Sequence, residues 1–234
     1  MPLISIVIPT LNEEKYLLNV FRGLKQQSFR DFEVIVSDKE STDRTRQIAK
    51  KNGAKVVVVK KAGIGAGRNA GAKIARGKIL VFIDADTRPS SDLLKVYSKA
   101  FKDPKIIAAT GPIFALEKTD ELTKLGYAFV SEIFVKVSIV FGRASIIGSN
   151  FAVRKSIFDK VRGFDEHLIT YEDYDLSLRI AKYGEIAFLQ GASVSASVRR
   201  VAAWGILKYF TYHFGNMVRY KFFRKSKDDY APIR

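Results

Sequence analysis

Cysteine is absent from this chain of 234 residues. That absence excludes a disulfide scaffold and a thiol nucleophile, and it is compatible with a reducing compartment. No stretch of about 18 uncharged apolar residues occurs either, so no helix is expected to span a bilayer. Residues 1–9 contain no basic stretch and predict a first strand rather than a signal peptide. These absences predict a protein that lies in solution or at a surface.

Acidic residues are few beside basic ones, 24 against 40, and the net charge is +16. Such a field attracts anionic partners, which include nucleic acid, anionic lipid and phosphorylated small molecules. The charge alone does not choose among them. Glutamine is also scarce and lysine abundant, a balance that favours a thermophilic source.

Short apolar runs alternate with helical patterns through the first half of the chain. The predicted strands are residues 4–8, 32–36, 55–59 and 79–83, and the predicted helices are residues 13–27, 42–51, 65–75 and 91–101. This rhythm predicts an α/β fold, a Rossmann-like and mainly parallel sheet with helices on both faces.

The regular alternation is lost in the second half. There we expect strands at 106–109 and 186–189 and helices at 122–141 and 173–183. No linker or repeat is visible. The simplest organisation is one domain over residues 1–200 followed by a helical tail at 201–234.

Two aspartates, Asp84 and Asp86, follow the apolar run Ile79–Ile83. Ligands of α/β sheets bind outside the carboxyl ends of such strands. Residues i and i+2 of an extended segment point the same way, so both carboxylates can converge on one divalent cation. A turn whose aspartates bond the local backbone is the alternative.

Glycines at 65 and 67, with Ala70, match a G-x-G-x-x-A dinucleotide pattern, but residues 60–64 separate them from the preceding strand, which argues against it. Beside Arg68 they suit a phosphate, or they allow close helix packing. Asp38 follows another strand and can accept a hydrogen bond from a nucleobase, whereas Ser41 is expected to cap the next helix.

Glu172, Asp173 and Asp175 open a predicted helix. Acids in a first turn stabilise a helix dipole. A carboxylate held there at a ligand crevice is also suited to take a proton from a hydroxyl nucleophile. Both interpretations remain open from these residues alone.

The tail is basic and aromatic. Residues 201–225 contain five cations, eight aromatic residues and no acid. This composition favours a helix on a membrane surface, and the alternative is a helix packed on the core with its lysines in water.

Together these segments resemble a family 2 glycosyltransferase of the GT-A fold over about residues 3–200. The motifs appear in the family's order: Ile-Val-Ile-Pro-Thr-Leu-Asn-Glu-Glu at 6–14, Asp38 with Ser-Thr-Asp at 41–43, Gly-Arg-Asn-Ala-Gly at 67–71, Asp-Ala-Asp at 84–86, Gly-Ser-Asn-Phe at 148–151, Gly-Phe-Asp-Glu at 163–166 and Glu-Asp-Tyr-Asp-Leu at 172–176. Each is weak alone, but seven in order are specific.

The resemblance implies a nucleotide-binding half at 1–110, an acceptor half at 111–200 and an inverting transfer from a UDP or GDP sugar. It also implies roles for individual residues: a nucleotide pocket at Pro9, Thr10, Asn12 and Glu13, Asp38 at the base, Arg68 near the diphosphate, Mn²⁺ or Mg²⁺ on Asp84 and Asp86, the general base at Asp173, and phosphate contacts at Arg199 and Arg200.

The chain departs from the family pattern at two glycines. Glu40 stands where Asp-Asp-Gly usually ends, which is expected to alter the loop beside the base. Arg162 replaces the first glycine of Gly-Gly-Phe-Asp-Glu, on the acceptor side. The helix expected at 122–141 is more apolar than a helix facing solvent should be.

We therefore expect a glycosyltransferase whose hydroxyl acceptor is a glycan or lipid-linked, peripheral at the cytoplasmic face of an anionic membrane. Transfer to a polyprenyl phosphate and a non-catalytic, membrane-associated nucleotide-sugar binder are the alternatives. Nucleic acid is not expected as a partner, because no recognition motif accompanies the basic stretch and an acidic crevice repels a phosphate backbone.

Overall fold

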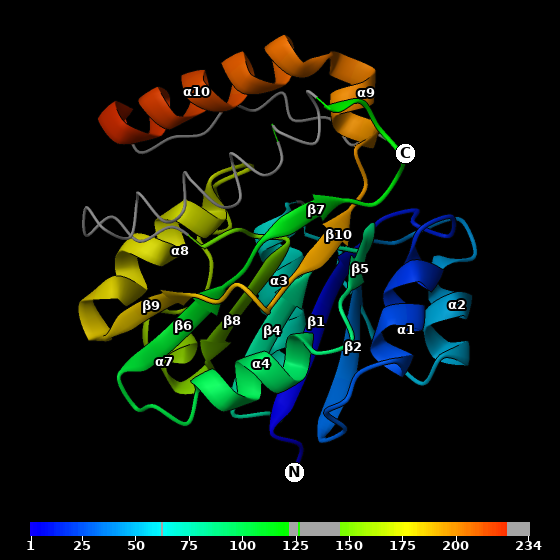
Figure 1. Ribbon diagram of the computed structural model, residues 1–234, viewed down its shortest axis with the longest axis vertical. Helices are drawn as coiled ribbons and strands as arrows, with labels where there is room; N and C mark the ends of the chain where they lie inside the picture. Colours follow the sequence, from blue (N-terminus) through cyan, green and yellow to red (C-terminus); the bar gives the residue numbers. More distant parts are fainter. Residues whose placement is uncertain (62, 122–125, 127–145, 224–234) are drawn as a thin grey trace.

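A seven-stranded sheet forms the centre of the computed structural model, which describes residues 1–61, 63–121, 126 and 146–223. The strand order is β3-β2-β1-β4-β8-β6-β9 (Figure 1). Its strands are β1 (Ile4–Thr10), β2 (Phe32–Asp38), β3 (Lys55–Val58), β4 (Ile79–Ile83), β6 (Ile106–Thr110), β8 (Asn150–Arg154) and β9 (Glu185–Phe188). Only β8 pairs antiparallel with its neighbours, β4 and β6, so the predicted mainly parallel α/β sheet is confirmed.

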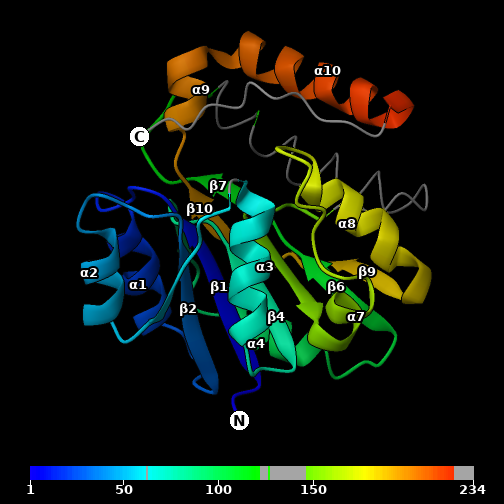
Figure 2. The same ribbon diagram turned by 180° about the vertical axis from the view of Figure 1, so that it is seen from behind.

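Helices cover both faces of this sheet, as Figures 1 and 2 show. One face carries α1 (Leu17–Lys25), α2 (Thr45–Lys51) and α4 (Leu93–Ala100), and the other carries α3 (Ile64–Ile74), α7 (Lys155–Lys160) and α8 (Glu172–Ile180), which a 3₁₀ turn, η2 (Ala181–Tyr183), extends. Alternation along β1 explains the two layers: Ile6 and Ile8 face the first core, whereas Val7 faces the second.

A second, three-stranded sheet brings the later part of the chain to the end of β4. Its strands are β5 (Thr87–Pro89), β10 (Val194–Ala196) and β7 (Ile113–Ala115), with β10 in the middle. Ala196 pairs with Thr87, and the next residue, Ser197, donates its N–H to the carbonyl of Asp86 at 3.0 Å. The segment after β10 therefore lies beside the predicted metal motif.

The basic aromatic segment forms two helices. They are α9 (Arg199–Trp204) and α10 (Ile206–Phe223), separated at Gly205, whose φ is +78°. The helix α10 crosses the end of the molecule where α8 begins (Figures 1 and 2). Tyr212, Asn216 and Tyr220, four residues apart, are buried on one face of α10. One face of the predicted tail thus packs on the domain.

Most first-half elements lie within a few residues of their predicted positions. The exception is α1, which begins at Leu17 and not at residue 13. The sequence interpretation missed the short strands β5, β7, β8 and β10 and the helix α7. The helix expected at 122–141 falls, apart from residue 126, outside the described residues, as do residues 224–234. Within the described part of the chain, no helix is long and apolar enough to cross a membrane.

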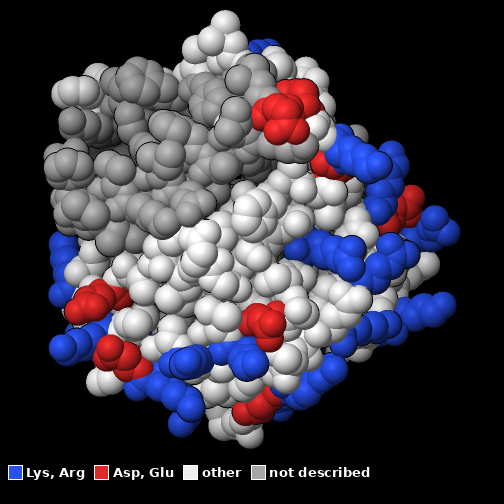
Figure 3. Space-filling view, in the orientation of Figure 1, with Lys and Arg blue, Asp and Glu red and all other residues white. Residues whose placement is uncertain are grey.

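Positive charge is distributed over the surface. On the face of Figure 3, lysine and arginine side chains lie mainly along the lower and right-hand edges, and the centre is largely uncharged. Proteins that bind along a nucleic acid backbone carry a basic patch or stripe. No continuous stripe of this kind crosses the described part of this face.

Both positions where family glycines are replaced have left-handed backbone: φ is +51° at Glu40 and +63° at Arg162. Glycine adopts this conformation freely, whereas other L-residues lose about 1–2 kcal/mol there. The loop after β2 therefore retains a backbone suited to glycine although its side chain differs.

Replacing Glu40 with glycine should stabilise the fold. Glu40 is exposed and its side chain makes no polar contact among the described residues. Relief of the left-handed backbone outweighs the added entropy of the unfolded chain, for a net gain of about 0.5–1 kcal/mol in urea unfolding. The control is Lys102→Gly, an exposed position without positive φ, which should lose stability by a similar amount. A loss for Glu40→Gly would contradict the assigned strain.

Candidate active site

Three neighbouring strands end at one edge of the central sheet and place polar residues there. Thr10 ends β1 opposite Asp38, the last residue of β2, and Asp84 follows β4. Because β1, β2 and β4 are parallel, their carboxyl ends share this edge, where α/β proteins bind ligands. The predicted nucleotide and metal residues are therefore brought together.

The loop after β1 is held to the loop after β2. Asn12 has a φ of +53°, and its Oδ1 accepts the N–H of Thr42 at 2.8 Å. Its own N–H donates to Ser41 Oγ at 2.8 Å, and the Glu13 N–H donates to Thr45 Oγ1 at 2.8 Å. These bonds tie the segment before α1 to the loop after β2, and α1 begins only after them, at Leu17.

Asp38 is fully buried beneath this loop pair. Its carboxylate accepts bonds from Thr10 Oγ1 at 2.9 Å, from the Ser41 N–H at 2.9 Å and from Ser41 Oγ at 2.5 Å, and Arg46 Nε lies 3.5 Å away. The interpretation of Ser41 as a helix cap is wrong, because α2 begins at Thr45 after Arg44. Ser41 instead joins the two loops, and a contact between Asp38 and a nucleobase stays a prediction.

Arg199, the first residue of α9, bridges the loop after β1 and the metal motif. Its guanidinium donates to both carboxylate oxygens of Glu13, at 3.0 and 2.8 Å, and its Nη2 lies 2.9 Å from Asp86 Oδ2. It also lies over the Tyr16 ring, 4.8 Å from the centroid. Arg200 lies over Trp204, 5.1 Å from that ring's centroid. The site thus includes Arg199 directly.

The two carboxylates of the metal motif interact. Burial and the neighbouring charge of Asp84 raise the pKa of Asp86 to about 7, although Arg199 opposes the shift. Asp84 Oδ2 and Asp86 Oδ1 accept no hydrogen bond from another described residue. Two oxygens are therefore available for a hard cation such as Mg²⁺ or Mn²⁺. Among the described residues, no group of three or more candidate ligand side chains occurs.

Arg68 occupies the centre of the site. Its side chain is 2% exposed, and its Nη1 donates to Glu172 Oε1 at 2.6 Å. Its Nη2 donates to Asp84 Oδ1 at 2.9 Å and to the Gly148 carbonyl at 2.8 Å. A contact between Arg68 and a diphosphate stays a prediction from the resemblance.

Asp173 lies in the first turn of α8, after Tyr171, whose φ is +67°. Its Oδ2 accepts the Gly148 N–H and its Oδ1 accepts the Tyr174 N–H, both at 2.8 Å. Burial raises the pKa of Asp173, although Arg68 lowers it. Burial likewise raises the pKa of Glu172. The carboxylate predicted as a base is held on a rigid helix start.

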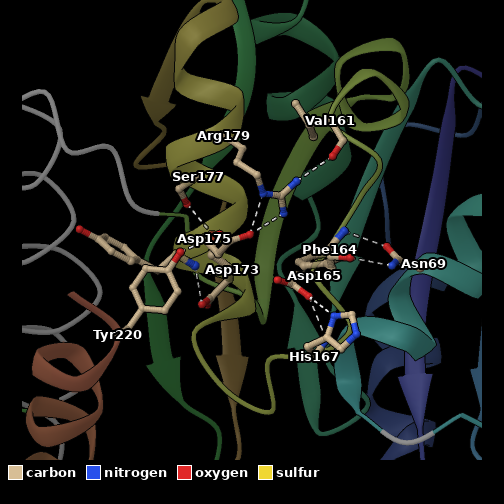
Figure 4. A network of polar contacts seen from close by, with 11 residues as sticks. Asn69, Val161, Phe164, Asp165, His167, Asp173, Asp175, Ser177, Arg179 and Tyr220 are labelled. Carbon is tan, nitrogen blue, oxygen red and sulfur yellow. Dashed lines mark hydrogen bonds and ion pairs between the residues drawn. The ribbon is translucent and has the colours of Figure 1, made fainter. Parts of the chain in front are cut away.

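Bonds on the far side of α8 hold that helix in place (Figure 4). Asp175 pairs with Arg179, which also donates to the Val161 carbonyl at 2.8 Å. From α10, the Tyr220 hydroxyl donates to Asp175 Oδ1 at 2.6 Å, and Asn216 donates to Thr170. The C-terminal helix therefore fixes the element that carries Asp173.

The glycines of α3 allow close packing. A Cβ at Gly71 would lie 2.4 Å from Val7 Cγ1, and a Cβ at Gly67 would lie 3.4 Å from Pro9 Cβ. Gly65 and Gly67 lie within α3, not in the turn directly after β3. These contacts favour the packing interpretation over a dinucleotide site.

The sequence interpretation gave no site role to two groups, the Gly148 peptide and Glu172. Gly148 belongs to a motif that carried the resemblance, and a Cβ there would lie 2.9 Å from Arg68 Nη2 and 3.0 Å from Asp173 Oδ2. The presence of Gly148 in a family motif, without a turn pattern to explain it, was the signal that could have indicated this role.

A family profile described as Glycosyl transferase family 2 matches residues 5–162, more than half of the chain. The chain belongs to glycosyl transferase family 2. The resemblance seen in the motifs is thereby confirmed, together with the GT-A fold and the prediction of a glycosyltransferase enzyme.

The names of two relatives of this glycosyltransferase describe enzymes that build glycans or modify glycan-like polymers. It is 27% identical to the amylovoran biosynthesis glycosyltransferase AmsB of Erwinia amylovora, over 94% of this chain and 75% of that protein. It is 35% identical over 99 residues to the poly(ribitol-phosphate) β-N-acetylglucosaminyltransferase TarS of Staphylococcus aureus. That match covers 39% of this chain and only 17% of TarS.

Solved structures share the fold. The mannosyltransferase PcManGT of Pyrobaculum calidifontis, in complex with GDP-Man and Mn²⁺, matches with a TM-score of 0.69 at 21% identity, over 93% of this chain and 64% of that one. TarS residues 1–349 in complex with UDP-GlcNAc match with a TM-score of 0.66 at 25% identity, over 84% of this chain and 58% of that one.

Proposed function

We propose that this chain transfers a sugar from a nucleoside-diphosphate sugar to a hydroxyl acceptor with inversion at the anomeric carbon. One observation carries the proposal: Arg68 joins the carboxylate of Asp84 to the turn and helix start that hold Asp173. The acid pair proposed to hold the cation and the carboxylate proposed as the base are thus linked through one arginine.

The donor pocket is formed by the joined loops after β1 and β2. Pro9, Thr10, Asn12 and Glu13 would line it on one side, and the loop after Asp38 would line it on the other. Solved neighbours bind UDP-GlcNAc and GDP-Man, which supports UDP or GDP as the nucleotide of this chain. Arg199 lies between Glu13 and Asp86, where its charge suits a diphosphate.

Asp84 and Asp86 would hold Mn²⁺ or Mg²⁺ through the two oxygens that no other described residue occupies. When bound, the ion would offset the negative charge of the leaving diphosphate. Burial and the neighbouring charge of Asp84 both raise the pKa of Asp86, and a buried pair of acids suits a cation as its partner.

The chemical step needs one proton transfer. Asp173 takes the proton of the acceptor hydroxyl as its oxygen forms a bond to the anomeric carbon. The bond from that carbon to the β-phosphate oxygen breaks, and its electron pair leaves with the nucleoside diphosphate. Attack and departure occur on opposite faces, so the configuration inverts. Asp173 then releases its proton to solvent.

A lipid-linked acceptor at a membrane surface is the further part of the proposal. Beyond the packed face of α10, Leu207, Phe222 and Phe223 are 76%, 70% and 71% exposed, and Lys208 and Arg219 are exposed beside them. Exposed aromatic and basic side chains suit a headgroup boundary.

Nucleotide binding should depend on a divalent metal. Calorimetry of UDP and GDP, each with and without Mn²⁺ or Mg²⁺, tests the cation pair and selects the nucleotide. Asp86→Ala should lose the metal dependence and most release of nucleoside diphosphate from UDP-GlcNAc or GDP-mannose. Asp159→Ala on the exposed side of α7 is the matched control and should keep both. Equal, metal-independent binding of both nucleotides would count against the site.

Asp173→Asn should leave nucleotide affinity within a few-fold and reduce turnover by about two orders of magnitude or more, because only the transition state needs the base. Asp159→Asn removes the same charge at an exposed position and should keep full turnover. An Asp173→Asn enzyme as fast as the wild type would favour an already ionised acceptor, such as a polyprenyl phosphate. Binding without turnover in the wild type would favour a binding protein.

Anionic vesicles should bind the protein through the end of α10. Replacing Phe222 and Phe223 together with serine should reduce sedimentation with phosphatidylserine-containing vesicles several-fold, and high salt should release the wild type. Leu18→Ser, an exposed apolar residue of α1, is the control and should bind normally. Equal sedimentation with neutral and anionic vesicles, or none with either, would refute the membrane contact.

A further inference from the structure

The contacts of Arg68 connect three segments that lie far apart in the sequence. Arg68 belongs to α3, Asp84 follows β4, Gly148 precedes β8 and Glu172 begins α8. The sequence separations of its three bonds are 16, 80 and 104 residues. One side chain therefore fixes the relative positions of elements from both halves of the domain.

Each partner of Arg68 is, or directly supports, a group that the proposed reaction uses. Asp84 carries one of the two carboxylates for the cation. The Gly148 peptide gives its carbonyl to Arg68 and its N–H to Asp173 Oδ2, at 2.8 Å each. Glu172 precedes Asp173 in α8. Asp173 is thus held from two directions by groups that Arg68 binds.

The geometry argues against Arg68 as a ligand of the donor. Its side chain is 2% exposed, and both terminal nitrogens donate to protein oxygens at 2.6–2.9 Å. Its Nε is buried and has no hydrogen-bond partner among the described residues. Because the guanidinium is buried, a phosphate could reach it only by displacing the protein atoms around it. Arg199, which is more exposed, is better placed for that contact.

We propose that Arg68 is a positioning residue, which holds the base Asp173 and the cation-side carboxylate Asp84 in one arrangement and makes no contact with the donor. This inference rests on the proposed function. A lysine cannot replace the planar fork, because a single ammonium does not span Glu172, Asp84 and the Gly148 carbonyl in the same way.

Arg68 also supplies a positive charge that acts on the base. Among the described residues, the titratable groups around Asp173 are Arg68 from α3, Glu172, Tyr171 and Tyr174 at the start of α8, and Tyr209 from α10. Arg68 is the positive charge in this set, and it lowers a pKa that burial raises. Its loss should therefore move the acidic limb of the turnover profile to higher pH.

The test compares Arg68→Met with Arg76→Met, which removes an exposed arginine near the end of the same helix. The measurements are nucleotide affinity, kcat for nucleoside diphosphate release from UDP-GlcNAc or GDP-mannose, and the pH dependence of kcat. Arg68→Met should keep nucleotide affinity within about three-fold, reduce kcat by about 100-fold and move the acidic limb upward. Arg76→Met should resemble the wild type. A loss of ten-fold or more in nucleotide affinity specific to Arg68→Met would overturn the inference.

Two further variants separate positioning from folding. The pair Arg68→Met with Glu172→Met removes both members of the more buried ion pair and leaves only Asp84 without its cation, so it should recover part of the thermal stability without recovering kcat. Arg68→Lys keeps the buried charge and should restore the pH limb with kcat still reduced. Recovery of kcat along with stability in the double variant, or a wild-type kcat in Arg68→Lys, would reduce Arg68 to a stabilising role.

The Asp173→Asn enzyme separates a failure of the positioning role of Arg68 from a failure of the proposed glycosyl transfer. If Asp173→Asn turns over normally, the proposed base is wrong whatever Arg68 does. If Asp173→Asn is inactive while Arg68→Met remains active with a normal pH profile, the function stands and only the positioning role fails.

Discussion

The buried guanidinium of Arg68 connects three segments that lie far apart from one another in the sequence. It lies 5.4 Å from the Phe164 ring centroid and binds two carboxylates and a carbonyl. Removing one partner of a buried ion pair costs about 3–5 kcal/mol, because the remaining charge stays unpaired. The positions of Asp84 and α8 therefore depend on one another, and both depend on α3.

This arrangement follows from a single reversed strand. The carboxyl ends of β1, β2 and β4 share an edge because those strands are parallel. Running antiparallel, β8 pairs Asn150 with Ile83, so its amino end lies at that same edge. The turn before β8 thus comes beside Asp84 and presents the Gly148 peptide between Arg68 and Asp173. A parallel β8 would have placed that turn at the opposite edge.

The sequence predicted the parts whose signals are local. The apolar runs of β1, β2, β3 and β4 and the aspartates after β4 needed no partner to be recognised, whereas short strands such as β8 and β10 are defined by distant pairing. The start of α1 was misplaced, and the bond that ties the segment before it to Thr45, about thirty residues away, has no local signal. The pairing of Arg199 with Glu13 was also beyond prediction, since 186 residues separate them.

The site is acidic although the chain as a whole is strongly basic. At the site, five carboxylates (Glu13, Asp84, Asp86, Glu172 and Asp173) face the two guanidiniums of Arg68 and Arg199. Arg68 binds one carboxylate oxygen of Asp84, and Arg199 binds one carboxylate oxygen of Asp86. The second oxygen of each aspartate is left for a cation. Burial and the neighbouring charge of Asp84 raise the pKa of Asp86, and burial raises the pKa of Asp173. A bound divalent cation would offset this surplus of carboxylates, whereas the basic surface attracts an anionic donor. The opposite signs of surface and centre thus serve different components of the proposed reaction.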